Sequence, residues 1–117
     1  MGRILLARAY DDEIPEGRRF LVDRVWPRGV SKDALHLDGW LRDAAPSTEL
    51  RRWFGHDPAR WEEFRRRYTA ELDARPEAWA PLREAAREGD VVLLFGARDT
   101  EHNNAVALRD HLRAFGG

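Results

Sequence analysis

The densest group of charged side chains in the sequence follows a run of apolar and aromatic residues. Asp23 and Arg24 lie within the end of that run, and Arg28 and Lys32 come shortly after it, around Gly29. A guanidinium can bind a phosphate or carboxylate through two parallel hydrogen bonds, and a glycine lets a ligand approach the backbone closely. The group therefore predicts an anion-binding site, and a purely structural ion pair between Asp23 and an arginine is the alternative.

Two histidines occur beside residues that could orient them. His56 directly precedes Asp57, and His102 lies between Asp99 and Asn103. An imidazole titrates near neutral pH, so each histidine is a candidate general acid or base. The alternative is that Asp57 and Asp99 simply cap helices. On the functional interpretation, the segment from Asp99 opens a helix, whose free backbone N–H groups attract an anion.

These patterns give one set of candidate site residues. The candidate catalytic residues are His56, His102 and Asp23, and the candidate ligand-binding residues are Arg24, Arg28, Lys32, Asp99 and Asn103. No metal site is predicted, because the histidines lack the short spacing to one another and to a carboxylate that is typical of zinc sites.

The elements that position these residues follow from hydrophobic periodicity and from helix and turn signals. We expect strands over residues 4–6, 20–26 and 91–95, and helices over 31–44, 48–54, from 57 onward, 76–89 and from 99 or 100 onward. Long helical segments between strands are typical of parallel crossovers. We therefore predict a single α/β domain over residues 1–117, with a small, mainly parallel sheet and helices packed on both faces. Ligands in such folds bind beyond the carboxyl ends of the strands.

One predicted helix carries an apolar stripe opposite a charged face. Trp61, Phe64, Tyr68 and Leu72 recur at helical spacing, and we expect them to lie in the core. The arginines at 65–67 alternate with glutamates, which is typical of a solvated helix face.

Composition excludes several classes of protein. The 20 basic residues are balanced by 21 acidic ones, so nothing favours a partner with a strongly anionic surface such as nucleic acid or a membrane. The absence of cysteine excludes disulfides, thiolate metal sites and cysteine nucleophiles. The longest apolar run, residues 91–97, is far shorter than a membrane span, and the first residues do not resemble a signal peptide. We therefore expect a cytoplasmic protein.

The combination of motifs resembles a known family. The segments that carry the resemblance are LVDRVWPRG at 21–29, APS at 45–47, LRRWFGHDP at 50–58, RY at 67–68, and LL at 93–94 followed by Asp99, His102, Asn103 and Ala105. They are similar to the YeaO-like family, domain of unknown function 488, and the resemblance covers nearly the whole chain. It implies no particular reaction, ligand or cofactor. The segment 95–98 departs from the expected pattern of a tyrosine or small residue followed by lysine, so no aromatic hydroxyl is expected there.

The residues favour one function and leave a second open. The first is binding of an anionic small molecule, such as a nucleotide or a phosphorylated metabolite, with acid-base chemistry by His56 or His102. The alternative is a non-enzymatic regulatory or interaction module that binds protein or nucleic acid through its arginine-rich helix. The sequence specifies no cofactor, reaction or oligomeric state.

Overall fold

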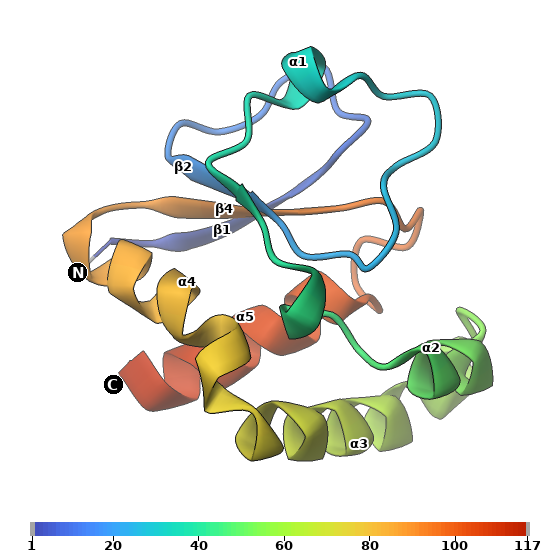
Figure 1. Ribbon diagram of the computed structural model, residues 1–117. Helices are drawn as coiled ribbons and strands as arrows, with labels where there is room; N and C mark the ends of the chain where they lie inside the picture. Colours follow the sequence, from blue (N-terminus) through green and yellow to red (C-terminus); the bar gives the residue numbers. More distant parts are fainter. Residues whose placement is uncertain (1, 117) are drawn as a thin grey trace.

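A parallel sheet of four strands forms the centre of the computed structural model, which describes the backbone of residues 2–116 and the side chains of residues 2–114. The strand order is β1 (Ile4–Arg8), β4 (Val91–Phe95), β2 (Arg18–Leu21) and β3 (Gly39–Trp40). All three strand pairs are parallel, so the carboxyl ends of the strands meet at one edge. The predicted α/β class with a small parallel sheet is confirmed (Figure 1).

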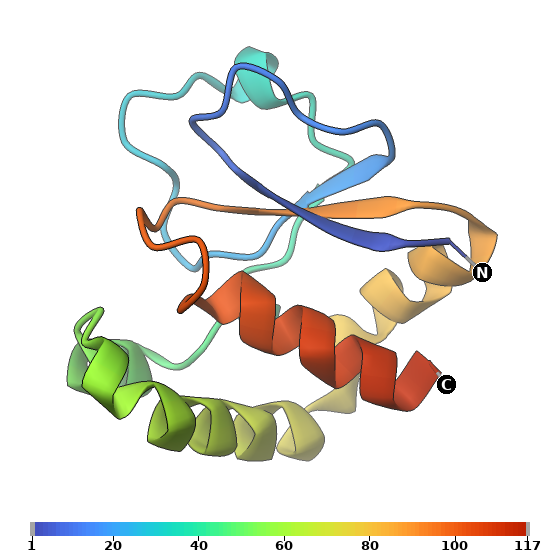
Figure 2. The same ribbon diagram turned by 180° about the vertical axis from the view of Figure 1, so that it is seen from behind.

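Helices of very different size cover the two faces of the sheet. On one face α4 (Pro76–Glu88) and α5 (Asn104–Gly116) lie against the strands, with α2 (Thr48–Phe54) and α3 (Trp61–Ala74) beyond them (Figures 1 and 2). The opposite face is covered by the single turn of α1 (Lys32–Leu35) and by the surrounding loops. Each face therefore has its own apolar cluster, and the fully buried β4 contributes to both, as its unbroken apolar sequence predicts.

The predicted helix over residues 31–44 is wrong. In its place the chain forms α1, the short edge strand β3 and a 3-10 turn, η1 (Arg42–Ala44). The backbone N–H groups of Asp38 and Leu41 donate to the carbonyls of Arg19 and Leu21, which extends the sheet at its edge. Trp40 packs on one apolar cluster and Leu41 on the other, as neighbouring residues of a strand do. Pairing with β2 therefore overrides a spacing that also fits a helix.

Two other predicted boundaries differ from the structure. The strand expected over 20–26 begins at Arg18 and ends at Leu21, although the Val22 N–H still donates to the Leu94 carbonyl. The last helix begins at Asn104 and not at residue 99 or 100, because the Asn103 side chain caps it by accepting the Val106 N–H. Phe115, predicted to lie on the apolar face of this helix, has a side chain outside the described residues.

Helices α2 and α3 begin where capping residues predict. Ser47 accepts the Leu50 N–H and Gly55 ends α2 in the left-handed conformation. Asp57 caps a 3-10 turn, η2 (Pro58–Arg60), that runs directly into α3. On α3 the residues Phe64, Tyr68 and Leu72 are buried, as their spacing predicts, and Trp61 is partly buried.

The helices of this fold are short or carry many charged residues. None of those between residues 2 and 116 is both long and apolar enough to cross a bilayer.

Replacing Phe64 by alanine should lower the free energy of unfolding by about 3 to 5 kcal/mol, because a buried phenyl ring is lost and a cavity remains. Phe64 is 1 % exposed and stacks on Phe54, with ring centroids 4.3 Å apart. Urea unfolding measures the change. Thr69→Ala, at an exposed position of the same helix, is the control and should change stability by less than about 0.5 kcal/mol. Equal stability of the two variants would contradict the core assignment.

Candidate functional site

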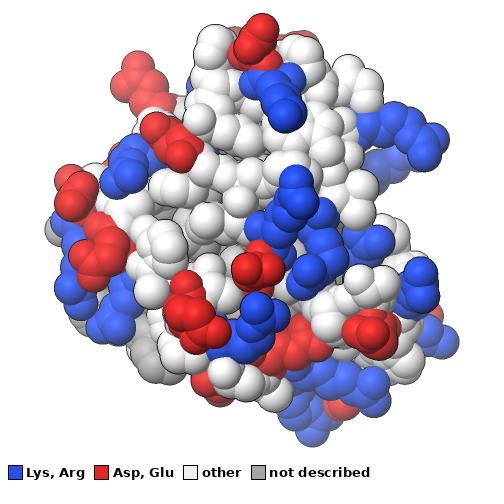
Figure 3. Space-filling view, in the orientation of Figure 1, with Lys and Arg blue, Asp and Glu red and all other residues white. Residues whose placement is uncertain are grey.

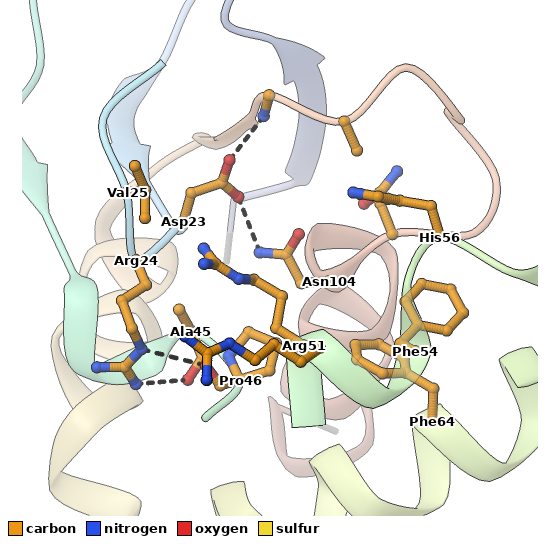
Figure 4. Close-up of a pocket in the computed structure, with 14 residues that line it drawn as sticks. Asp23, Arg24, Val25, Ala45, Pro46, Arg51, Phe54, His56, Phe64 and Asn104 are labelled. Carbon is orange, nitrogen blue, oxygen red and sulfur yellow. Dashed lines mark hydrogen bonds between the residues drawn. The ribbon is translucent and has the colours of Figure 1, made fainter. Parts of the chain in front are cut away.

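A pocket of about 410 Å³ opens at the carboxyl edge of the sheet. Its floor consists of residues that directly follow β2 and β4 and of the start of α5, and its walls come from α2 and from the segment that leads into it (Figure 4). Segments distant in the sequence therefore converge where ligands bind in parallel α/β folds. Of the candidate residues from the sequence, Asp23, Arg24, His56 and Asn103 line this pocket.

Asp23 joins three elements at the floor of the pocket. Its Oδ2 accepts the Gly96 N–H at 2.8 Å, and its Oδ1 accepts a hydrogen bond from Asn104 Nδ2 at 3.0 Å. The same Asn104 amide donates to the Val22 carbonyl at 2.9 Å. Gly96 suits this position because a Cβ atom there would lie only 3.2 Å from Asp23 Oδ2. The contact ties the ends of β2 and β4 to the first residue of α5.

The pKa of Asp23 is raised above its ordinary value. Burial is the largest cause, because it disfavours the charged carboxylate, and the hydrogen bonds from Asn104 and Gly96 oppose the shift. Electrostatic interactions with Arg51 and His56 oppose the shift as well. A carboxylate whose charged form is disfavoured by burial, in a pocket that also contains cationic side chains, marks a candidate functional site.

The Arg24 side chain is hydrogen-bonded to the backbone that forms a wall of the pocket. Its Nε donates to the Pro46 carbonyl at 3.2 Å and its Nη2 to the Ala45 carbonyl at 3.4 Å. In Figure 4 its guanidinium turns away from Asp23 toward these carbonyls. The alternative of an ion pair between Asp23 and Arg24 is therefore not what the structure contains.

Arg51 and Arg52 of α2 also line the pocket, and sequence reasoning did not select them. Within the part of the chain that the structure describes, neither side chain forms a hydrogen bond or an ion pair. Arg51 extends from α2 across the pocket in Figure 4. Figure 3 shows basic side chains gathered on this side of the molecule, between the sheet and α2. Both arginines belong to the LRRWFGHDP segment at 50–58, which carries the family resemblance. They were not selected because arginines on a surface helix are ordinarily solvated.

His56 lies at the rim of the pocket, at the end of α2. Gly55 and His56 both have positive φ angles, 53° and 57°, which turn the chain sharply out of the helix. A left-handed conformation carries a steric cost for a residue with a Cβ atom. The His56 ring is near Phe54, with centroids 6.3 Å apart, and no described carboxylate is hydrogen-bonded to it.

His102 has the orienting carboxylate that His56 lacks, but it does not line the pocket. Its Nδ1 lies 2.9 Å from Asp99 Oδ2, and its ring meets Trp61 edge-on at 5.4 Å. Asp99 Oδ1 accepts the backbone N–H groups of Glu101 and His102, and these hydrogen bonds are the main causes that lower the pKa of Asp99. The group pins the loop after β4 against α3.

Asn103 is buried and serves as a cap. Its Nδ2 donates to the Asp99 carbonyl and its Oδ1 accepts the Val106 N–H. Its neighbour Asn104, not selected from the sequence, is the residue that contacts Asp23. The prediction had placed the cap at residue 99 or 100, which shifted the start of the helix and concealed the role of Asn104.

Arg28 and Lys32 lie outside the lining of the pocket. Arg28 is an exposed residue of the loop after β2, and its carbonyl accepts the Tyr10 hydroxyl at 3.0 Å. Lys32 is exposed in α1, on the opposite face of the sheet. They diverge from Asp23 because β2 ends earlier than predicted and the chain then crosses to the other face. Among the described residues no cluster of histidine and carboxylate side chains could hold a metal ion.

The raised pKa of Asp23 predicts a specific pH dependence of stability. The folded state holds the Asp23 proton more tightly than the unfolded chain, so this contribution to stability is fully present below the ordinary pKa of 3.8 and is lost as the pH rises through the raised value. The unfolding free energy of the wild type minus that of Asp23→Asn should therefore fall as the pH rises from below 3.8 through the raised pKa of Asp23. Chemical unfolding at a series of pH values measures it. A difference that stays constant or grows with pH would contradict the assignment.

Comparisons with known proteins give the family. The model of the family described as "Inactive DUF488-N3 subclade" matches residues 3–115. The chain is 41% identical over 108 residues to "Uncharacterized protein YeaO" of Escherichia coli (strain K12), covering 92% of this chain and 94% of that protein. It is 40% identical to "Uncharacterized protein Mb3100c" of Mycobacterium bovis, covering 91% and 90% of the two chains. No solved structure matches significantly. The chain belongs to the YeaO-like DUF488 family, within its DUF488-N3 subclade.

Proposed function

We propose that this protein binds an anionic small molecule in the pocket at the carboxyl edge of the sheet and does not catalyse a reaction on it. The observation that carries the proposal is the pair Arg51 and Arg52, which line the pocket and whose guanidinium groups form no hydrogen bond or ion pair with any described residue. A guanidinium offers several N–H donors in a planar fork that matches phosphate and carboxylate groups. Arg24, by contrast, is occupied by the carbonyls of the pocket wall.

The surroundings of these arginines support a ligand of modest size. A volume of about 410 Å³ lies in the range of small-molecule sites. Apolar side chains, among them Phe54, Phe64 and Pro46, form part of the lining. Such walls displace water and strengthen the attraction between a guanidinium and an anion.

The arrangement of the histidines supports binding without turnover. A general base needs both access to the substrate and an orientation that other groups fix. His56 lines the pocket but has no orienting carboxylate among the described residues, and His102 has one in Asp99 but lies outside the lining. The description of the matching subclade as inactive agrees with this separation.

The alternative of an interaction module with an arginine-rich helix has less support. Arg65, Arg66 and Arg67 of α3 each form ion pairs with a neighbouring glutamate, and Arg65 also pairs with Asp110 of α5. These contacts neutralise the charge that a nucleic acid would need.

Inorganic phosphate and pyrophosphate should each raise the thermal unfolding temperature of the wild type in a saturable way at fixed ionic strength. Binding to the folded state alone adds about 2.7 kcal/mol of stability when the ligand is at a hundred times its Kd. Arg51→Gln should lose most of this response, because the variant removes one of the two guanidinium groups that line the pocket without a hydrogen bond or ion pair to a described residue. Differential scanning fluorimetry measures the shift.

Arg28→Gln is the matched control, because it removes the same charge from an exposed loop residue outside the pocket. It should respond to both anions as the wild type does. An equal loss of response in Arg28→Gln and Arg51→Gln would contradict the location of the site. Release of phosphate from pyrophosphate that disappears in His56→Gln would contradict binding without turnover.

A further inference from the structure

We infer that the ligand of this pocket is a phosphate ester that also carries a hydroxyl or amino group, and that this second group donates a hydrogen bond to Asp23 while the phosphate binds Arg51 and Arg52. The inference rests on the proposed function and extends it from an anion to a class of molecule. Sugar phosphates and nucleoside monophosphates both belong to that class.

Asp23 retains the capacity to accept a further hydrogen bond. A carboxylate has about four lone-pair sites on its two oxygens, and the described partners of Asp23 use one site on each oxygen. Both partners, Gly96 and Asn104, line the pocket together with Asp23. The remaining lone pairs are therefore available beside groups that a ligand in the pocket would touch. A hydroxyl or amino group is the complement of such an acceptor.

The same carboxylate excludes a simple anion from the floor of the pocket. Two negative charges close together in a partly desolvated site repel strongly. Burial also makes the charge of Asp23 costly even without a ligand, and the Asp23 pKa is raised accordingly. An anionic group should therefore bind away from Asp23, near the guanidinium groups of α2. The pocket thus combines a hydrogen-bond acceptor, Asp23, with cationic side chains of α2, of which Arg51 acts electrostatically on Asp23.

The lining between these two ends suits a carbon framework. Ala45 and Pro46, from the segment before α2, Ala97, from the loop after β4, and the rings of Phe54 and Phe64 are among the apolar residues of the lining. Figure 4 shows Asp23 and Asn104 on the sheet side of the pocket and Phe54 with Phe64 on the helix side. A ligand with a polar donor at one end and a phosphate at the other would place its uncharged part against these residues.

The test compares three phosphates by isothermal titration calorimetry: methyl phosphate, which has no second donor, ribose 5-phosphate and adenosine 5′-monophosphate. The wild type should bind at least one of the two hydroxyl-bearing esters about tenfold more tightly than methyl phosphate. This comparison needs no variant, so it can overturn the inference even if substitution of Asp23 disrupts the fold. If methyl phosphate binds as tightly as both hydroxyl-bearing esters, the inference is wrong and the anion site stands.

Asp23→Asn distinguishes recognition by Asp23 from a structural role. The variant should lose most of the preference for the hydroxyl-bearing ester, while its affinity for methyl phosphate stays the same or increases because a negative charge has been removed. If Asp23 has a purely structural role, the variant should bind all three phosphates more weakly by a similar factor. That outcome would overturn the inference. If no phosphate binds the wild type at all, the proposed function fails and the inference fails with it.

Discussion

The carboxylate of Asp23 is the contact on which the carboxyl edge of the sheet depends. It accepts hydrogen bonds from the Gly96 N–H after β4 and from the Asn104 side chain at the start of α5. The Asp23 carbonyl also accepts the Trp40 indole N–H from β3 at 2.7 Å. A single residue, Asp23, therefore joins the end of β2 to β4, α5 and β3. Without the carboxylate, the Gly96 N–H would lose its acceptor, and Asn104 would keep only its hydrogen bond to the Val22 carbonyl. An unsatisfied polar group in a partly buried site costs more than the net value of the hydrogen bond.

The wall of the pocket is fixed by a second set of polar contacts. The segment 44–47 connects η1 to α2, and side chains from outside it hold its polar groups. The Tyr68 hydroxyl donates to the Ala44 carbonyl, and Arg24 donates to the next two carbonyls. Glu71 accepts both the Ser47 N–H at 2.8 Å and the Ser47 hydroxyl at 2.6 Å. A segment of irregular backbone is thereby positioned as firmly as a strand, because its polar groups are satisfied.

The arginines that line the pocket have different roles. Arg24 donates to backbone carbonyls, whereas Arg51 and Arg52 line the pocket without a hydrogen bond or ion pair to a described residue. The two candidate histidines also differ in their surroundings. Asp99 orients His102 against Trp61, whereas His56 lines the pocket beside Phe54 without a hydrogen bond to a described carboxylate. The pocket thus contains cationic side chains, and within the described residues the histidine that a carboxylate orients lies outside its lining.

The sequence alone determined the elements that depend on local signals. The unbroken apolar run 91–95 identified the central strand, Ser47 and Gly55 marked the ends of α2, and the spacing of Phe64 and Tyr68 identified the buried face of α3. These predictions succeeded because capping, periodicity and continuous apolarity act within a few residues along the chain. The position of Asp23 at the carboxyl edge was also expected from the parallel topology.

Only the tertiary structure decided the rest. The spacing of Leu37, Trp40 and Leu41 fits a helix, but pairing with β2 makes this segment an edge strand. Arg28 follows Asp23 closely in the sequence, but it lies outside the lining of the pocket. Arg51 and Asn104 are distant from Asp23 in the sequence, yet both interact with it in the structure. Which of two adjacent asparagines caps α5 depends on where Asp23 lies. Contacts between distant segments are set by how the sheet and helices pack, and local sequence patterns carry no information about that packing.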